Sequence, residues 1–273
     1  MPASGEPALD RWTTPRFKRS VAGPEPIGLL DMLDQARAEL APTGVLRAAI
    51  NLSNFLLVTG KTPSGDPAGV SPDIARAVAD RLGVPIRYVT FPSPGELADA
   101  ATEDIWDIGN IGAEPERAKN IAFSAAYAEI EATYLVPTGS AIQSVEEVDR
   151  EGVRIAVSAR SAYELWLTDN IQHAQLRLAQ GLDASFDLFV EQKLEVLAGL
   201  RPRLITDVEN LPGARVLDGR FTAVQQAIGT KPDRTVGTSF LRAFVEEAKA
   251  SGLVGSLIEK HSVTGKLTVA PPA

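Results

Sequence analysis

The sequence of 273 residues contains no cysteine and only two histidines. Without cysteine, the protein has no disulfide, no thiolate metal ligand and no cysteine nucleophile. His173 and His261 lie far apart in the sequence, so we interpret both as surface or packing residues and expect no histidine-based catalytic relay. No apolar run approaches the roughly 18 residues that a membrane-spanning helix needs. We therefore expect no metal, no cofactor and no membrane span.

Basic residues are fewer than acidic ones, and the net charge is −8. No basic patch stands out, which argues against a nucleic-acid partner. The remaining composition, 44% apolar and 23% charged, is that of an ordinary globular protein. The chain is long enough for two lobes or one large domain.

The N-terminal segment lacks the apolar core of a secretory signal. Residues 1–26 are rich in Pro, Gly and Ser, and we expect them to be irregular. Either the protein stays in the cytoplasm or the exported form uses a different start, and the sequence leaves both open. Apolar residues then recur at Ile27, Leu30, Leu33 and Leu40, which predicts an amphipathic helix over 27–40 on the outside of the first lobe.

Strands and helices alternate through the rest of the chain, with a hairpin-type turn at 61–69. The predicted strands are 45–51, 85–91, 105–111, 132–137, 153–158, 176–179, 202–207 and 222–229, and 186–198 combines a helix with a strand. The predicted helices are 69–83, 94–102, 144–148, 161–171 and 234–259. This order implies parallel α/β lobes, in which ligands bind at the carboxyl ends of the strands.

The most informative stretch runs from Asp107 to Tyr127. Its small residues at Gly109, Gly112 and Ala113 let a ligand approach the backbone closely. Arg117 follows, and its planar guanidinium suits a carboxylate better than any other side chain does. The alternative for Arg117 is a solvated arginine at the start of a helix.

This stretch resembles the ligand loop of the family 3 extracytoplasmic solute-binding proteins, the amino-acid receptors of ABC importers. The arginine and the Phe-Ser-x-x-Tyr segment of that loop match Arg117 and residues 123–127. The start of the 69–83 helix and the order of the elements extend the resemblance over residues 43–265. It implies a two-lobe periplasmic-binding-protein-like α/β fold, in which each lobe is a mostly parallel sheet flanked by helices and two hinge strands join the lobes. We divide the chain into an N-terminal extension (1–43), lobe 1 (44–135 and 228–268) and lobe 2 (136–227).

The resemblance also implies how a carboxylate ligand is held. Arg117, the backbone N–H groups near Gly112 and the hydroxyl of Ser161 from lobe 2 would bind it. Arg160 stands where the family has glycine, and it either reaches solvent or adds an anion contact. The other candidates are Asn54, Phe55, Asn110 and Glu114. Gly112 and Glu114 replace hydroxyl residues that are usual in the family.

The amine-binding half of the family site is different in this sequence. In the family, the hydroxyl at the position of Gly112 and an acid of lobe 2 clamp the ammonium group of the ligand. The best match for that lobe 2 segment is 192–200, which places Glu195 on a structural acid and Gly199 on the amine-binding acid. Burying an ammonium group without a charged partner costs several kcal/mol. We therefore expect a small organic acid or a modified amino acid, unless Glu114 supplies the missing charge.

Three functions remain open at this point. The first is a monomeric solute-binding protein that captures a small carboxylate between two closing lobes, for an ABC-type permease or a sensory role; the family is extracytoplasmic. The second is an enzyme on the same fold, similar to the cyclohexadienyl dehydratases, with Glu114 as general acid. The third is a cytoplasmic sensory or interaction module that docks through the 27–40 helix. No paired carboxylates, nucleophile–base pair or phosphate loop supports the second.

Overall fold

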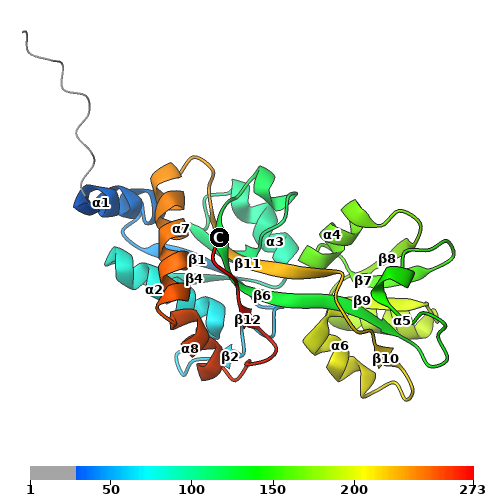
Figure 1. The fold of residues 1–273 in the computed structure, drawn as a ribbon. Helices are drawn as coiled ribbons and strands as arrows, with labels where there is room; N and C mark the ends of the chain where they lie inside the picture. Colours follow the sequence, from blue (N-terminus) through cyan, green and yellow to red (C-terminus); the bar gives the residue numbers. More distant parts are fainter. Residues whose placement is uncertain (1–28) are drawn as a thin grey trace, which may run out of the picture.

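The structure is a computed structural model that describes residues 29–273. Two lobes share two long strands, β6 (Ala122–Val136) and β11 (Thr222–Thr230), which run from one lobe into the other (Figure 1). Residues 1–26 and the first two residues of the predicted 27–40 helix lie outside the described part. The remainder of that helix is α1 (Leu29–Leu40).

Lobe 1 is built on a mostly parallel sheet. Its elements before β6 are β1 (Leu46–Asn51), β2 (Gly60–Lys61), β3 (Pro67–Ala68), α2 (Val70–Leu82), β4 (Ile86–Phe91), α3 (Pro94–Asp99), η1 (Ala100–Thr102), β5 (Ile108–Gly112) and η2 (Arg117–Lys119). After β11 the chain adds α7 (Thr235–Ala250), α8 (Leu253–Lys260) and β12 (Thr268–Val269). The sheet order is β4-β1-β5-β11, in which β1 is parallel to β4 and β5 and β11 is antiparallel to β5. The β2–β3 pair is the predicted hairpin.

Lobe 2 repeats this arrangement. Its elements are η3 (Val145–Glu147), β7 (Arg154–Ser158), α4 (Ala162–Asn170), β8 (Gln175–Ala179), α5 (Leu182–Glu191), β9 (Val196–Leu200), α6 (Arg201–Val208) and β10 (Arg215–Val216). The sheet order is β8-β7-β9-β6, again with three parallel strands and one antiparallel strand. Each lobe therefore presents the carboxyl ends of three parallel strands to the space between the lobes. The predicted lobe boundaries at 135 and 228 fall inside β6 and β11.

One predicted element is wrong. The 202–207 segment, predicted as a strand, forms helix α6, with Pro202 in its first turn. Proline is favourable there because the first N–H groups of a helix have no intrahelical partner and the fixed φ of proline suits the turn. Leu204 is buried beneath the helix whereas Ile205 is about half exposed, so the side chains follow a helical pattern and not strand alternation.

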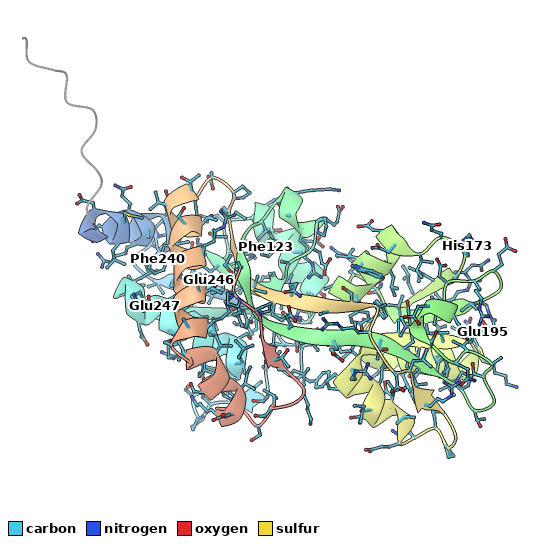
Figure 2. All side chains as sticks on the ribbon, viewed as in Figure 1. Phe123, His173, Glu195, Phe240, Glu246 and Glu247 are labelled. Carbon is cyan, nitrogen blue, oxygen red and sulfur yellow. The ribbon has the colours of Figure 1, made fainter. Side chains whose placement is uncertain are left out.

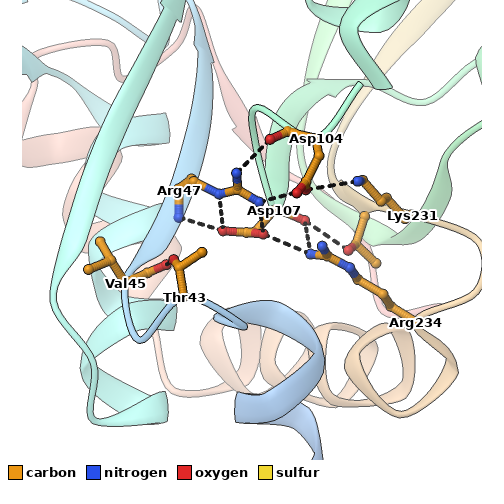
Figure 3. Close-up of polar contacts among 8 residues, drawn as sticks. Thr43, Val45, Arg47, Asp104, Asp107, Lys231 and Arg234 are labelled. Atoms are coloured by element: carbon orange, nitrogen blue, oxygen red, sulfur yellow. Dashed lines mark hydrogen bonds and ion pairs between the residues drawn. The ribbon is translucent and has the colours of Figure 1, made fainter. Parts of the chain in front are cut away.

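An arginine near the start of the first parallel strand pairs with a carboxylate in each lobe. In lobe 1, Asp107 accepts hydrogen bonds from the backbone N–H and the guanidinium of Arg47 and from Arg234, all at 2.8–3.0 Å (Figure 3). In lobe 2, Glu195 accepts equivalent bonds from the backbone and guanidinium of Arg154 at 2.7–2.9 Å. Each pair ties two neighbouring parallel strands together at the end of the sheet opposite the space between the lobes.

The apolar face of α1 is covered by α7. Ala36 and Leu40 are fully buried, and Glu39 Oε2 accepts a 2.7 Å hydrogen bond from the backbone N–H of Gly237 in α7. This helix thus packs on the outside of lobe 1, as its amphipathic pattern predicted. Within residues 29–273, no helix combines the length and the hydropathy needed to cross a membrane.

Candidate functional site

A cavity of about 350 Å³ lies between the two lobes. All six parallel strands reach it with the residues at or just after their carboxyl ends, and Val224 and Gln226 of the shared strand β11 add to its wall. The wall residues after these strands include Asn51, Ser53, Asn54, Ser93, Glu96, Gly112, Arg117, Ser158, Arg160, Ser161, Tyr163, Gln180 and Leu200. The cavity therefore lies at the carboxyl ends of the parallel strands, where the order of strands and helices in the sequence predicted a ligand site.

Arg117 is the most deeply buried charge in the wall of this cavity, with 5% of its surface exposed. Its Nη1 donates to the carbonyl of Gly112 at 2.8 Å and its Nη2 donates to the carbonyl of Arg160 at 2.9 Å. Burial lowers the pKa of Arg117 to about 10. The guanidinium forms no ion pair with any carboxylate in the described part of the chain. Glu114 and Glu164 lie near enough to offset part of this lowering of the pKa, and a bound anion would stabilise the buried cation further.

Gly112 permits the close approach that holds Arg117 in place. A Cβ atom on Gly112 would lie 3.0 Å from the Cβ of Ala162, 3.1 Å from Val224 and 3.3 Å from Nη1 of Arg117. A serine or threonine would therefore require Ala162, Val224 or the Arg117 guanidinium to shift by a few tenths of an ångström.

Ser161 lies in the cavity wall and begins helix α4. Its hydroxyl accepts a 3.1 Å hydrogen bond from the N–H of Glu164, and the Glu164 carboxylate accepts a 2.9 Å bond from the N–H of Arg160. This reciprocal capping fixes the turn between β7 and α4. The hydroxyl of Ser161 keeps its O–H available as a donor to a ligand.

The structure brings together five of the eight residues predicted from the sequence: Asn54, Gly112, Arg117, Arg160 and Ser161. The other three lie outside the cavity wall. Phe55 is exposed, and Asn110 is buried within β5 between Ile50 and Ile228 with no hydrogen-bond partner for its amide among the described residues. The Asn54 amide oxygen accepts hydrogen bonds from the N–H groups of Leu56 and Leu57 at 3.2–3.3 Å, so it shapes the loop after β1.

Glu114 is half-buried on the lobe 1 loop, beside the cavity but not in its wall. Burial raises the pKa of Glu114 to about 7, the nearby Arg117 opposes the rise, and Asp169 of lobe 2 adds to it. This carboxyl is therefore partly protonated near neutral pH. It is poorly placed to supply a fixed negative charge for an ammonium group.

Gly199, which the sequence matched to the amine-binding acid of the family, does not line the cavity. Gly199 pairs with Thr133 inside the sheet, and a Cβ there would lie 2.9 Å from Leu204. The residue of β9 that reaches the cavity wall is Leu200. Both residues are uncharged, so the wall has no carboxylate at the end of β9. The acid in the wall is Glu96, an exposed residue that accepts a hydrogen bond from Ser93 Oγ at 3.2 Å.

Sequence reasoning did not identify the other polar wall residues. Ser93 and Gln180 follow a strand and Ser158 ends one, which is the available signal for these three, whereas Gln226 lies within β11 and has no such signal. Tyr163 is 3% exposed, and its hydroxyl has no hydrogen-bond partner among the described residues. The two histidines lie in different lobes, and His173 lies at the outer end of lobe 2 (Figure 2). Residues 29–273 contain no cluster of His, Cys, Asp and Glu arranged to hold a metal.

Comparisons with known proteins agree with this geometry. The profile of the bacterial extracellular solute-binding proteins, family 3, matches residues 54–264. The structure is similar to a solute receptor for L-cysteine of Neisseria gonorrhoeae, with a TM-score of 0.68, 18% identity, and coverage of 86% of this chain and 99% of the other.

Two further structures are similar over most of the chain. An ancestral amino acid-binding protein, described as a precursor of cyclohexadienyl dehydratase, has a TM-score of 0.65 and 22% identity and covers 84% of this chain and 98% of its own. A substrate-binding protein of an amino acid ABC transporter from Streptococcus pneumoniae, bound to L-arginine, has a TM-score of 0.64 and 20% identity, with 81% and 96% covered. No curated protein sequence matches the chain.

Proposed function

Since the chain belongs to family 3 of the bacterial extracellular solute-binding proteins, we propose that it captures a small carboxylate that lacks a free ammonium group, such as an organic acid or an N-modified amino acid. Arg117 carries this proposal. Its guanidinium is buried in the cavity wall and bonds to two carbonyl oxygens but to no carboxylate of the described chain. Three of its five N–H donors remain for a ligand.

The rest of the wall supports the same ligand class. The hydroxyl of Ser161 can donate to the second carboxylate oxygen, and the end of β9 contributes Leu200, which has no charge to pair with an ammonium group. A cavity of about 350 Å³ is at the small end of ligand sites. Lobe closure would then present the bound solute to an ABC importer, as the similar transporter proteins imply. For an enzyme on this fold, the nominated acid Glu114 lies outside the wall, which favours binding over turnover.

The test is a thermal-shift and calorimetric screen of L-amino acids, their N-acetyl forms and small organic acids. A ligand at a hundredfold above its Kd adds about 2.7 kcal/mol of stability. We expect hits among carboxylates without a free ammonium group. Arg117→Met should weaken these hits at least a hundredfold, because it removes a desolvated charged donor pair worth about 3 kcal/mol. Arg117→Lys keeps the charge but not the fork, and we expect an intermediate loss.

A gain of function provides the matching control. Leu200 is the N-cap residue of α6, a position where aspartate is favourable, but its side chain is buried in the core, so Leu200→Asp should lose stability and its urea midpoint is measured before binding is tested. The substitution should also add a carboxylate at the cavity wall and bring binding of plain α-amino acids. Strong binding of free α-amino acids by the unmodified protein, or hits that Arg117→Met leaves unchanged, would contradict the proposal.

A further inference from the structure

Arg160 has an unusual backbone for its residue type. Its φ is +60°, in the left-handed region that costs about 1 kcal/mol or more for residues other than glycine. The strained turn is held from both sides, because the N–H of Arg160 donates to Glu164 at 2.9 Å and its carbonyl accepts from Arg117 at 2.9 Å. The backbone of Arg160 is therefore part of the contact between the lobes.

The side chain of Arg160 crosses from lobe 2 to helix α3 of lobe 1. Its guanidinium pairs with Asp99 through two parallel hydrogen bonds, from Nη1 to Oδ2 at 2.8 Å and from Nη2 to Oδ1 at 2.6 Å. Nη2 also donates to the carbonyl of Gly95 at 3.2 Å. Such a fork is the strongest geometry for an arginine–carboxylate pair. It also lowers the pKa of Asp99.

Gly95 of lobe 1 leaves room for the guanidinium of Arg160. A Cβ atom on Gly95 would lie 2.9 Å from Cζ of Arg160 and 3.0 Å from its Nε and Nη1. Any other residue at position 95 would push the arginine away. The guanidinium thus lies flat against a bare stretch of backbone, with Asp99 one helical turn further along α3.

Arg160 also separates two cavities. The 350 Å³ cavity described above and a second one of about 440 Å³ share two wall residues, Arg117 and Arg160. The second cavity is otherwise lined by α3, the loop after β5 and Leu165 of α4, including the exposed residues Thr102, Glu116 and Asn120. Arg117 and Arg160 therefore line the boundary between these two parts of the cleft, and we call the first, which the carboxyl ends of the strands of both lobes reach, the inner cavity.

We propose that Arg160 is the residue that determines solute size in this protein: its pair with Asp99 holds the lobes closed without solute and limits the solute to the inner cavity. The closure does not depend on what the protein binds. The size limit rests on the proposed function, because it presumes a carboxylate on Arg117. The two parts therefore need separate measurements.

Closure is measured as a distance between the lobes. The chain contains no cysteine, so spin labels at Glu103→Cys in lobe 1 and Gln172→Cys in lobe 2, both exposed positions, have no background. Without solute, we expect the distance distribution of the otherwise unmodified protein to be dominated by a single short distance. Asp99→Asn and Arg160→Gly should each raise the open-to-closed ratio about fivefold, which corresponds to about 1 kcal/mol for a half-exposed pair.

The design includes three internal controls. The double variant should open no further than either single variant, because both remove the same interaction. Arg160→Lys, which keeps the charge without the fork, should give an intermediate ratio. Glu259→Gln removes an exposed charge from lobe 1 outside the cavity wall and should change nothing. If the distance distribution is the same in the unmodified protein and in both single variants, the Arg160–Asp99 pair does not hold the lobes closed.

Size selection is measured with N-acylglycines of increasing acyl length, from acetyl to octanoyl, by calorimetry. We expect the unmodified protein to bind the short members and to lose affinity at least tenfold for the long ones. Arg160→Gly should join the two cavities and remove that loss. An unchanged length limit in Arg160→Gly would overturn the size limit. If no N-acylglycine binds either protein, the size limit fails, while the carboxylate screen still decides the proposed ligand class and the spin-label distances still decide the proposed closure.

Discussion

Replacing Asp107 with asparagine tests how the buried ion pair of lobe 1 contributes to stability. Asp107 is completely buried, and its partners Arg47 and Arg234 keep only 8% and 11% of their side-chain surface exposed. The bond to Asp107 is the main cause of the raised pKa of Arg47. Asparagine preserves the shape of the side chain but removes its charge. Two guanidinium groups would then be left with no buried counter-charge.

The expected magnitude follows from burial. Breaking a buried pair by removing one partner costs about 3–5 kcal/mol, whereas an exposed pair contributes about 0–1 kcal/mol. Asp104 still pairs with Arg47 at 2.9 Å, and the amide oxygen still accepts a hydrogen bond, so we expect about 3 kcal/mol for Asp107→Asn. Glu195→Gln breaks the equivalent pair of lobe 2, where both side chains are 36% exposed. We expect about 1 kcal/mol or less there.

Urea unfolding measures both variants. Trp106 lies next to Asp107 in lobe 1 and Trp166 lies in α4 of lobe 2, so fluorescence reports on each lobe, and the midpoint gives the free energy once the slope is shown to be unchanged. The reasoning requires a clear difference between the two variants. Equal losses, or a loss below about 1 kcal/mol for Asp107→Asn, would show that hydrogen-bond geometry and not burial determines the contribution of these pairs.

Two further predictions concern Glu114 and Gly69. Burial raises the pKa of Glu114 from 4.5 to about 7, so the folded protein binds this proton more tightly than the unfolded chain does; the resulting stability is present below pH 4.5 and is lost as the pH rises through 7. Glu114→Gln should flatten that part of the pH profile of the urea midpoint, and a profile identical to that of the unmodified protein would contradict the burial effect. Gly69 has φ +154°, and a Cβ there would lie 2.1 Å from the carbonyl oxygen of Leu57, so Gly69→Ala should destabilise lobe 1 by more than about 3 kcal/mol. Gly60→Ala, where a Cβ meets nothing within 4 Å, should change the midpoint by less than about 0.5 kcal/mol and is the matched control.

Local sequence signals predicted most of the fold. The alternation of apolar strands with capped helices locates β1, α2, β4, β5, β7 and α4 within a residue or a few of their observed bounds. The 202–207 segment failed because an apolar pair after a strand fits either period, and the prediction gave too little weight to Pro202. The burial of Leu204, on the side of α6 that faces Gly199 of β9, is what favours a helix over a strand for this segment.

The site was less predictable because its wall depends on which strands are neighbours. Arg117 and Ser161 carry motif signals, and both reach the cavity. Asn110 lies in a strand that reaches the cavity, but it is buried within the sheet and does not line the cavity, which a single sequence does not reveal for a strand buried on both faces. The contact between Asp99 and Arg160 joins residues 61 positions apart on different lobes, and only the closed arrangement of the lobes creates it.

The shared strands also constrain the order in which the chain can fold during synthesis. The sheet of lobe 2 is complete once β10 has been made, since its strands run from β6 to β10 without interruption. Lobe 1, although it begins first, must wait for β11 to cover the open edge of β5 and for Arg234 to reach Asp107. The nascent chain therefore carries an unpaired strand edge through the synthesis of the whole second lobe, the state in which a growing α/β protein is most exposed to aggregation.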